Sequence, residues 1–254
     1  MSTLTRLQLL PQEEERAEAR LIQPAGSGYV LLAAEIDAHP PFLWPSRTKR
    51  RLIEDCARWC AGIARQPGVL EAVTFKAILF PPIGEPGFLR RRREQFHRAH
   101  FDLVVLVETE SVARAEALFA GGSFRALEAH LRSEAGHVYT VSASNAKRIG
   151  AVDHRRGGVF LFNYFYADSL AQNLAVWEYT AGWFEKETGL DNSTVLAPTD
   201  PDLSQYTLIN HCRWDALGDV LPSLVLKRSF RNFVLAHFDA NDTAPMPILY
   251  RLAG

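Results

Sequence analysis

Hydrophobic residues in the first half of the chain fall into short continuous runs separated by stretches with helical spacing. The runs at 28–38, about 69–80 and 101–108 are bounded by Gly or Pro breaks, which is typical of buried strands. Ser46 can cap a helix that Pro67-Gly68 ends, and a second helical region covers about 111–135 before a strand opens at His137. The pattern predicts β-α-β-β-α-β, a ferredoxin-like unit.

The same order of elements recurs in the second half. The predicted elements are a strand at 160–166, a helix capped by Ser169 and Gly189, strands from Thr194 and over 206–214, a helical region at 216–239 with a break near Pro222 and Lys227, and a strand from Pro247. The second half therefore predicts a second ferredoxin-like unit.

Short motifs repeat in the same order in the two halves. Gly28-Tyr-Val-Leu-Leu matches Gly158-Val-Phe-Leu-Phe, and Ser123-Phe-Arg matches Ser229-Phe-Arg. Their common order indicates a duplicated module. We therefore expect an N-terminal arm or short surface helix at 1–27, one repeat at 28–145, a linker at 143–158 and a second repeat at 158–254.

A ferredoxin-like unit covers one face of its sheet with helices and leaves the other face to a partner. Two units in one chain can cover each other, sheet against sheet, and close a barrel. This α+β arrangement resembles the dimeric α/β-barrel superfamily, here built within one polypeptide. A homodimer remains possible, but it is not needed to complete the core.

Composition narrows the function classes. The chain has 254 residues, a formal net charge of -1 and 47% hydrophobic residues, so no overall basic character favours nucleic acid or an anionic membrane as a partner. The N-terminal sequence turns acidic after a very short apolar segment, which predicts neither a signal peptide nor a spanning helix and favours a cytoplasmic location. Three cysteines do not predict a disulfide framework.

The segment Asn210-His-Cys-Arg-Trp214 holds the candidate chemistry. Strand alternation places Asn210, Cys212 and Trp214 on one face and His211 and Arg213 on the other. An Asn four residues before a Trp, followed by a broken helix with Ser229-Phe-Arg, resembles the third-strand signature of the antibiotic-biosynthesis monooxygenase family. Asn163, on the first strand of the repeat, is similar to an Asn that heme-degrading relatives carry there.

The resemblance implies oxygenation of a small aromatic or polyketide-like substrate with no metal or flavin cofactor. It implies that Asn210 and Trp214 orient the substrate and that Arg231 stabilises its anion. Asn163, Phe165 and Trp177 are the candidate substrate-binding residues. The heme-degrading branch would need a His where this chain has Leu224, so heme degradation is disfavoured.

The first repeat lacks this motif. Alignment on the shared Ser-Phe-Arg places Val104 at the position of Asn210 and Glu108 at that of Trp214. We therefore expect one site per chain, with the first repeat as the scaffold that covers the sheet of the second.

Alternatives remain open for each candidate. Asn210 and Trp214 also suit a hydrogen-bonded core pair, and Trp177 suits a core aromatic. The protein would then be a non-enzymatic binder of a small hydrophobic ligand. A deep pocket beside Asn163, Asn210 and Trp214 would favour an enzyme, and tight packing with Asn210 bonded to protein would favour the binder.

Two further features have a simple interpretation and a sharper alternative. Cys56 and Cys60, one helical turn apart, are expected to be small core residues rather than metal ligands. The Arg90-Arg-Arg-Arg93 run is expected in a solvated loop, with a gate for an anionic ligand as the alternative. RNA binding would need exposed aromatics on a free sheet face, which the duplication argues against.

Overall fold

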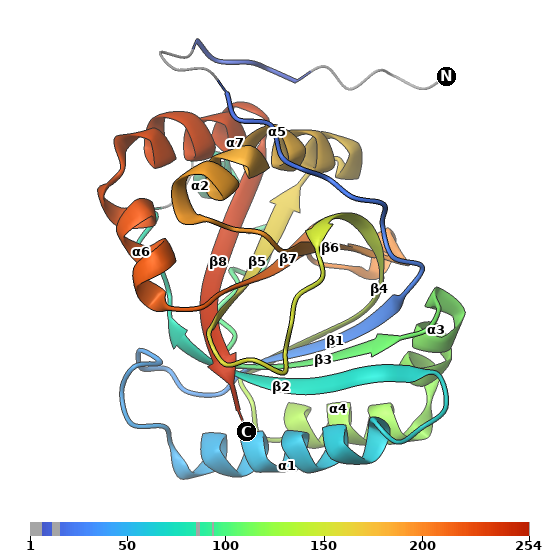
Figure 1. The fold of residues 1–254 in the computed structure, drawn as a ribbon. Helices are drawn as coiled ribbons and strands as arrows, with labels where there is room; N and C mark the ends of the chain where they lie inside the picture. The colour runs from blue at the N-terminus through green and yellow to red at the C-terminus, as the bar shows by residue number, and fades with distance from the viewer. Residues whose placement is uncertain (1–6, 12–15, 85–86, 93, 254) are drawn as a thin grey trace.

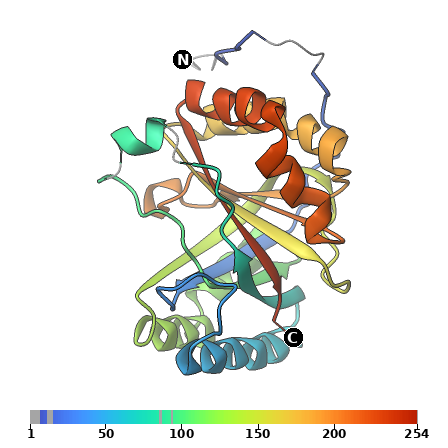
Figure 2. The same cartoon turned by 90° about the vertical axis from the view of Figure 1, so that its left-hand side faces the viewer.

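The structure, a computed structural model, describes residues 7–11, 16–84, 87–92 and 94–253. Within these residues eight antiparallel strands close a barrel in the order β1-β3-β2-β8-β5-β7-β6-β4, and helices cover it on two opposite sides (Figures 1 and 2). The first half consists of β1 (Gly28–Glu35), α1 (Arg47–Ile63), β2 (Val69–Leu79), α2 (Gly87–Arg91), β3 (Leu103–Thr109), α3 (Val112–Ala120), α4 (Gly122–Arg132) and β4 (His137–Gly150).

The second half repeats this order with small additions. It consists of β5 (Val159–Ala167), α5 (Leu170–Thr188), β6 (Ser193–Pro198), the short 3-10 helix η1 (Pro201–Leu203), β7 (Leu208–Trp214), α6 (Leu217–Leu226), the π-helical segment η2 (Phe230–Leu235), α7 (Ala236–Ala240) and β8 (Thr243–Leu252). The predicted tandem of ferredoxin-like units is confirmed.

The two sheets join along two seams. Each half has its own four-stranded order, β4-β1-β3-β2 and β8-β5-β7-β6, and β2 pairs with β8 while β4 pairs with β6. The inner faces meet as predicted, because Phe75 of the first half packs edge-on against Phe160 and Phe162 of the second, with ring centroids 5.1 Å apart in each pair. Burial of these rings against each other removes from water the sheet face that each half alone would expose.

Local capping follows the sequence closely. The Ser46 side chain accepts from the backbone N–H of Lys49 at the start of α1, and that of Ser169 accepts from Gln172 at the start of α5. Gly189 ends α5 in the left-handed conformation with φ 67°. The helix of the second half therefore ends at a fixed point, immediately after Thr188.

Two expectations about element bounds are wrong, and a third is confirmed only in part. β4 continues to Gly150, through half of the segment expected to be a linker. Of the breaks expected in the helical region of 216–239, the one at Lys227 is confirmed, whereas Pro222 lies inside α6. The basic run begins in the short helix α2, which ends at Arg91. Arg92 follows it and pairs with Asp168 at 2.7 Å, and Arg93 lies outside the described residues.

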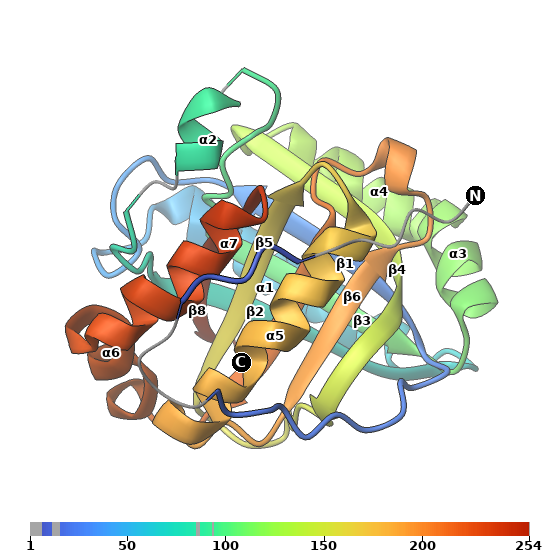
Figure 3. The same cartoon turned by 90° about the horizontal axis from the view of Figure 1, so that it is seen from above.

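The N-terminal arm crosses the helices of the second half in extended form (Figure 3). The backbone N–H of Arg20 donates to Glu185 on α5, and a Cβ added to Gly182 of α5 would lie 2.1 Å from the carbonyl oxygen of Ala17. The described part of the arm contains no helix, so the alternative of a surface helix fails there. None of the helices in the described part of the chain has the length and hydropathy needed to cross a membrane.

Candidate functional site

The candidate site lies between the sheet of the second half and the helices that cover it. Asn163 on β5 and Asn210 on β7 are direct cross-strand partners, and both face the helices. The described residues there line two small cavities among mostly buried side chains. We call the first the α5 cavity, of about 30 Å³, which Asn163, Phe165, Trp177, Asn210 and Trp214 border.

The second buried cavity, which we call the α6 cavity, has a volume of about 20 Å³. It shares Asn163 and Trp214 with the α5 cavity and borders Leu224 and Phe230 of the C-terminal helices. A single water needs roughly 10–15 Å³ measured in this way. Each cavity therefore has room for one or two waters, and an aromatic ligand requires movement of the surrounding side chains.

Asn163 brings an unpartnered acceptor to both cavities. The residue is 9% exposed, and its Oδ1 has no hydrogen-bond partner among the described residues. A buried polar atom without a partner costs about 1–3 kcal/mol, so a donor in the cavity would remove a penalty. Asn210 differs, because its Oδ1 accepts from Ser193 Oγ at 2.5 Å.

Trp214 is shared by the buried cavities and a pocket at the surface. It lines both cavities and also a surface pocket of about 340 Å³, which we call the entrance pocket. Its Nε1 donates to Thr188 Oγ1 at 3.0 Å, and Thr188 also lines the entrance pocket. The fixed end of α5 therefore holds the indole in place.

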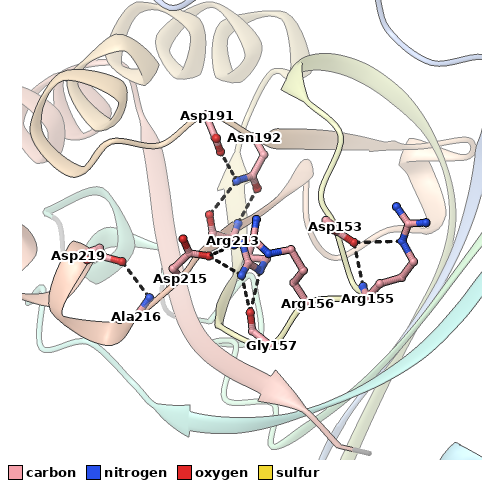
Figure 4. Close-up of polar contacts among 10 residues, drawn as sticks. All are labelled: Asp153, Arg155, Arg156, Gly157, Asp191, Asn192, Arg213, Asp215, Ala216 and Asp219. Carbon is pink, nitrogen blue, oxygen red and sulfur yellow. Dashed lines mark hydrogen bonds and ion pairs between the residues drawn. The ribbon is translucent and has the colours of Figure 1, made fainter.

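Charged side chains surround the entrance pocket (Figure 4). Arg213 donates to Asp215 Oδ1 at 2.6 Å, and Arg156 donates to the same oxygen at 3.0 Å. The hydrogen bond from Arg213 and the nearby charge of Arg156 lower the pKa of Asp215. Asn192 holds the Arg213 backbone through its N–H and its carbonyl, both at 2.8 Å.

The buried cavities, in contrast, are almost without ionisable groups. Among the described residues that line them, Cys212 alone is ionisable, and burial raises the pKa of its thiol. No carboxylate or imidazole is therefore positioned there as a general base. Among all described residues, no group of three or more His, Cys, Asp and Glu is arranged to hold a metal ion.

The structure brings five of the six predicted site residues together. Asn163, Phe165, Trp177, Asn210 and Trp214 all border the α5 cavity. The expectation for Arg231 fails: it is exposed on η2 and donates to the carbonyl of Val225 at 2.6 Å. The π-helical turn and the break at Lys227 turn its side chain away from the cavities.

The directions of the side chains in β3 and β7 show that the sequence alignment of these two strands is wrong. Val104 and Glu108 of β3 face the barrel interior, whereas Asn210 and Trp214 of β7 face the helices. The alignment is therefore displaced by one residue, and such a slip reverses the face of every side chain. The helix-facing residues of β3 are Leu103, Val105 and Val107, so the amide and the indole are still missing from the first repeat.

His211 faces the interior and makes buried polar contacts, as its alternation predicts. Its Nδ1 donates to the carbonyl of Leu161 at 2.9 Å, which leaves Nε2 to accept from His154 Nε2 at 2.8 Å. His154 Nδ1 then lies 2.5 Å from the Glu71 carboxylate of β2. The chain of contacts connects the segment between the repeats to both sheets.

Two residues of the site have no recognisable signal in the sequence. Thr188 is the last residue of a helix and Ser193 the first of a strand, and neither position has a spacing that marks it.

Cys56 and Cys60 are buried in the helix-side core of the first half as expected, and burial raises the pKa of Cys60 to about 11.

Comparisons with known proteins relate the fold to oxygenase-like structures. No protein-family model matches the sequence, and no curated protein matches it. A solved structure described as an anthrone oxidase-like protein superposes with a TM-score of 0.62 at 12% identity, over 94% of this chain and 93% of that one. A putative monooxygenase from Fusobacterium nucleatum subsp. nucleatum gives 0.52 at 8% identity, over 91% and 94%. The likeness establishes the dimeric α/β-barrel fold.

Proposed function

We propose that the C-terminal half binds a small aromatic or polyketide-like molecule and oxygenates it without a metal or flavin. The observation that supports this most directly is the unpartnered Oδ1 of Asn163 in an apolar cavity beside Asn210 and Trp214. A phenolic hydroxyl is a donor on an apolar ring, and it matches both properties of the cavity.

The bound ring would lie where the two cavities now meet. Its hydroxyl donates to Asn163, and its faces pack against Phe165 and Trp177. Because the cavities have room for only one or two waters each, the ring can enter only when the Trp214 side chain and the C-terminal helices move away. The protein then contributes orientation and exclusion of water.

The chemistry needs no external reductant if the substrate itself is oxidised. When a ring methylene activated by a neighbouring phenol becomes a ketone, one oxygen atom of O₂ enters the product and the other leaves as water. The substrate supplies all four electrons. Because the described cavity lining offers no general base, the proton of the enol form leaves to water in the entrance pocket. Two solved structures of this fold are described as anthrone oxidase-like and as a putative monooxygenase, which agrees with this chemistry.

Ligand binding without catalysis is the second candidate function. It is favoured by the bond between Asn210 and Ser193, by the small cavities and by the lack of an ionisable base in the described lining. Both candidates use the same site and the same acceptor on Asn163.

One experiment separates the candidates. Binding of anthrone and 1-naphthol is measured by calorimetry, and oxygen uptake is followed with an electrode. Oxygenation predicts binding together with uptake, and Asn163→Leu loses both. Asn173→Leu is the matched control, since Asn173 is a buried amide on α5 whose side-chain atoms also lack partners and which does not line either cavity. Binding without uptake establishes the second candidate, and no binding eliminates both.

A further inference from the structure

Trp214 is the one described residue that lines the entrance pocket and both buried cavities. It is packed in the core of the second half and donates a hydrogen bond to Thr188. Rotation of this side chain would join the polar pocket of about 340 Å³ to the apolar interior. A ligand that enters here would leave any substituent that does not fit inside among the charged groups of the entrance pocket.

These charged groups have an excess of carboxylates. Among the described residues the lining contains Asp153, Asp191, Asp215 and Asp219 and two cations, Arg156 and Arg213. Both guanidinium groups bind Asp215. Arg155, outside the lining, pairs with Asp153 at 3.4 Å. The pocket with this partner therefore keeps a net negative charge of one, and its cations are already engaged.

Asp191 and Asp219 retain acceptor capacity toward a ligand. Asp191 accepts from the Asn192 side chain, and Asp219 accepts from the backbone N–H of Ala216, as Figure 4 shows. Among the described residues neither carboxylate has an ion-pair partner, and each has oxygen lone pairs left over. A hydroxyl or an ammonium group would be attracted here, and a carboxylate would be repelled.

A ligand entering from the entrance pocket past Trp214 would reach Asn163, and this residue independently indicates a ligand. Asn163, which is nine-tenths buried, has an acceptor that no group in the described part of the chain satisfies. The path thus offers an acceptor at its apolar inner end and carboxylates at its outer end. A molecule that fits both has a hydroxylated ring and a polar arm on its opposite side.

We propose that the site selects aromatic phenols with a short arm that ends in an ammonium or hydroxyl group, and that it discriminates against arms ending in a carboxylate. The ring passes Trp214 into the cavities, and the arm stays in the entrance pocket beside Asp191 and Asp219. This inference rests on the proposed ligand-binding function and adds its substrate class.

Four hydroxyindoles with the same ring test the selectivity by calorimetry at low salt. They are 5-hydroxyindole, which has no arm, 5-hydroxytryptamine, 5-hydroxytryptophol and 5-hydroxyindole-3-acetate. We expect the amine and the alcohol to bind at least about tenfold more tightly than the carboxylate, because the carboxylate enters a pocket of its own sign.

Asp191→Asn with Asp219→Asn is the diagnostic variant, since each Asn keeps an oxygen acceptor and removes a charge. The ratio of dissociation constants between carboxylate and amine should fall below about threefold. Asp202→Asn, on the exposed turn η1 outside the pocket, should leave the ratio unchanged.

Equal binding of amine and carboxylate, or an unchanged ratio in the double variant, overturns the selectivity. Binding of 5-hydroxyindole distinguishes a failure of the selectivity from a failure of ligand binding. If it binds and the ratio is near one, the proposed function stands and this inference fails. If none of the four binds, the inference fails together with the ligand-binding function on which it rests.

Discussion

Trp214 donates its indole N–H to the hydroxyl of Thr188 at 3.0 Å, and this contact joins the end of β7 to the end of α5. Trp214 is buried although it borders a surface pocket, and it also lines the two internal cavities. One neutral hydrogen bond contributes about 1 kcal/mol in addition to the burial of the ring, so loss of the bond should make the indole easier to displace.

Replacement of Thr188 by Val keeps the shape of the side chain and removes the acceptor of Trp214. We expect the free energy of unfolding to fall by about 1 kcal/mol and the association rate of 5-hydroxyindole, followed by stopped-flow fluorescence, to rise. Ser123→Ala is the matched control, because it removes the bond of 2.9 Å that Trp59 donates to Ser123 Oγ in the first half. An equal effect of the control on the association rate would show that the Trp214 bond does not control access.

Asn163 and Asn210 should respond oppositely to the same substitution. Asn163→Leu removes an unsatisfied buried acceptor, so the free energy of unfolding should stay the same or rise by about 1 kcal/mol. Asn210→Leu leaves the fully buried hydroxyl of Ser193 without its acceptor, so it should lower the free energy of unfolding by about 1–3 kcal/mol. Urea denaturation measures both values. A clear loss of stability in Asn163→Leu would mean that its amide supports the fold.

The sequence predicts the elements of this fold well because their signals are local. The caps at Ser46, Ser169 and Gly189 depend on a few neighbouring residues, and the alternation from Asn210 to Trp214 follows from the geometry of one strand. The relation between the repeats was harder. The shared Ser-Phe-Arg lies in helices, so it could not detect a one-residue offset between β3 and β7.

The site itself was only partly predictable. Five candidates converge because strand alternation and helix periodicity place them on facing surfaces. Cavity volume depends on how distant side chains pack together, and the pairing of Asn210 with Ser193 depends on the position of β6. The direction of Arg231 is set by the π-helical turn, which hydrophobic spacing does not reveal.

Each repeat should need the other to cover the apolar inner face of its sheet. Fragments 1–152 and 153–254, expressed separately, would expose rings such as Phe75 in one case and Phe160 and Phe162 in the other. We expect each fragment alone to aggregate or self-associate, and the pair produced together to form a 1:1 complex. Size-exclusion chromatography with light scattering measures the assemblies. A monomeric, cooperatively folded fragment would contradict the mutual covering of the two sheets.

The protein should lose stability as the pH falls below neutrality because of His211. Burial first, and the neighbouring His154 second, hold the pKa of His211 well below its usual range, so the folded protein keeps this ring neutral. In the unfolded chain the ring titrates near pH 6.5. Below about pH 6.5 the unfolded state therefore binds a proton that the folded state does not bind. The free energy of unfolding then falls by up to about 1.4 kcal/mol per pH unit.

His211→Gln tests this origin of the pH dependence, since Gln keeps polar atoms in the barrel and does not titrate. Between about pH 7.5 and about pH 5, the variant should show a smaller loss of unfolding free energy than the wild type. Burial also lowers the pKa of the partly exposed His137, which leaves a residual slope of the same sign. Addition of His137→Gln to the first variant should reduce this remaining pH dependence further. Equal slopes in the wild type and His211→Gln would assign the acid sensitivity to other groups and leave the His154–His211 contact without a thermodynamic role.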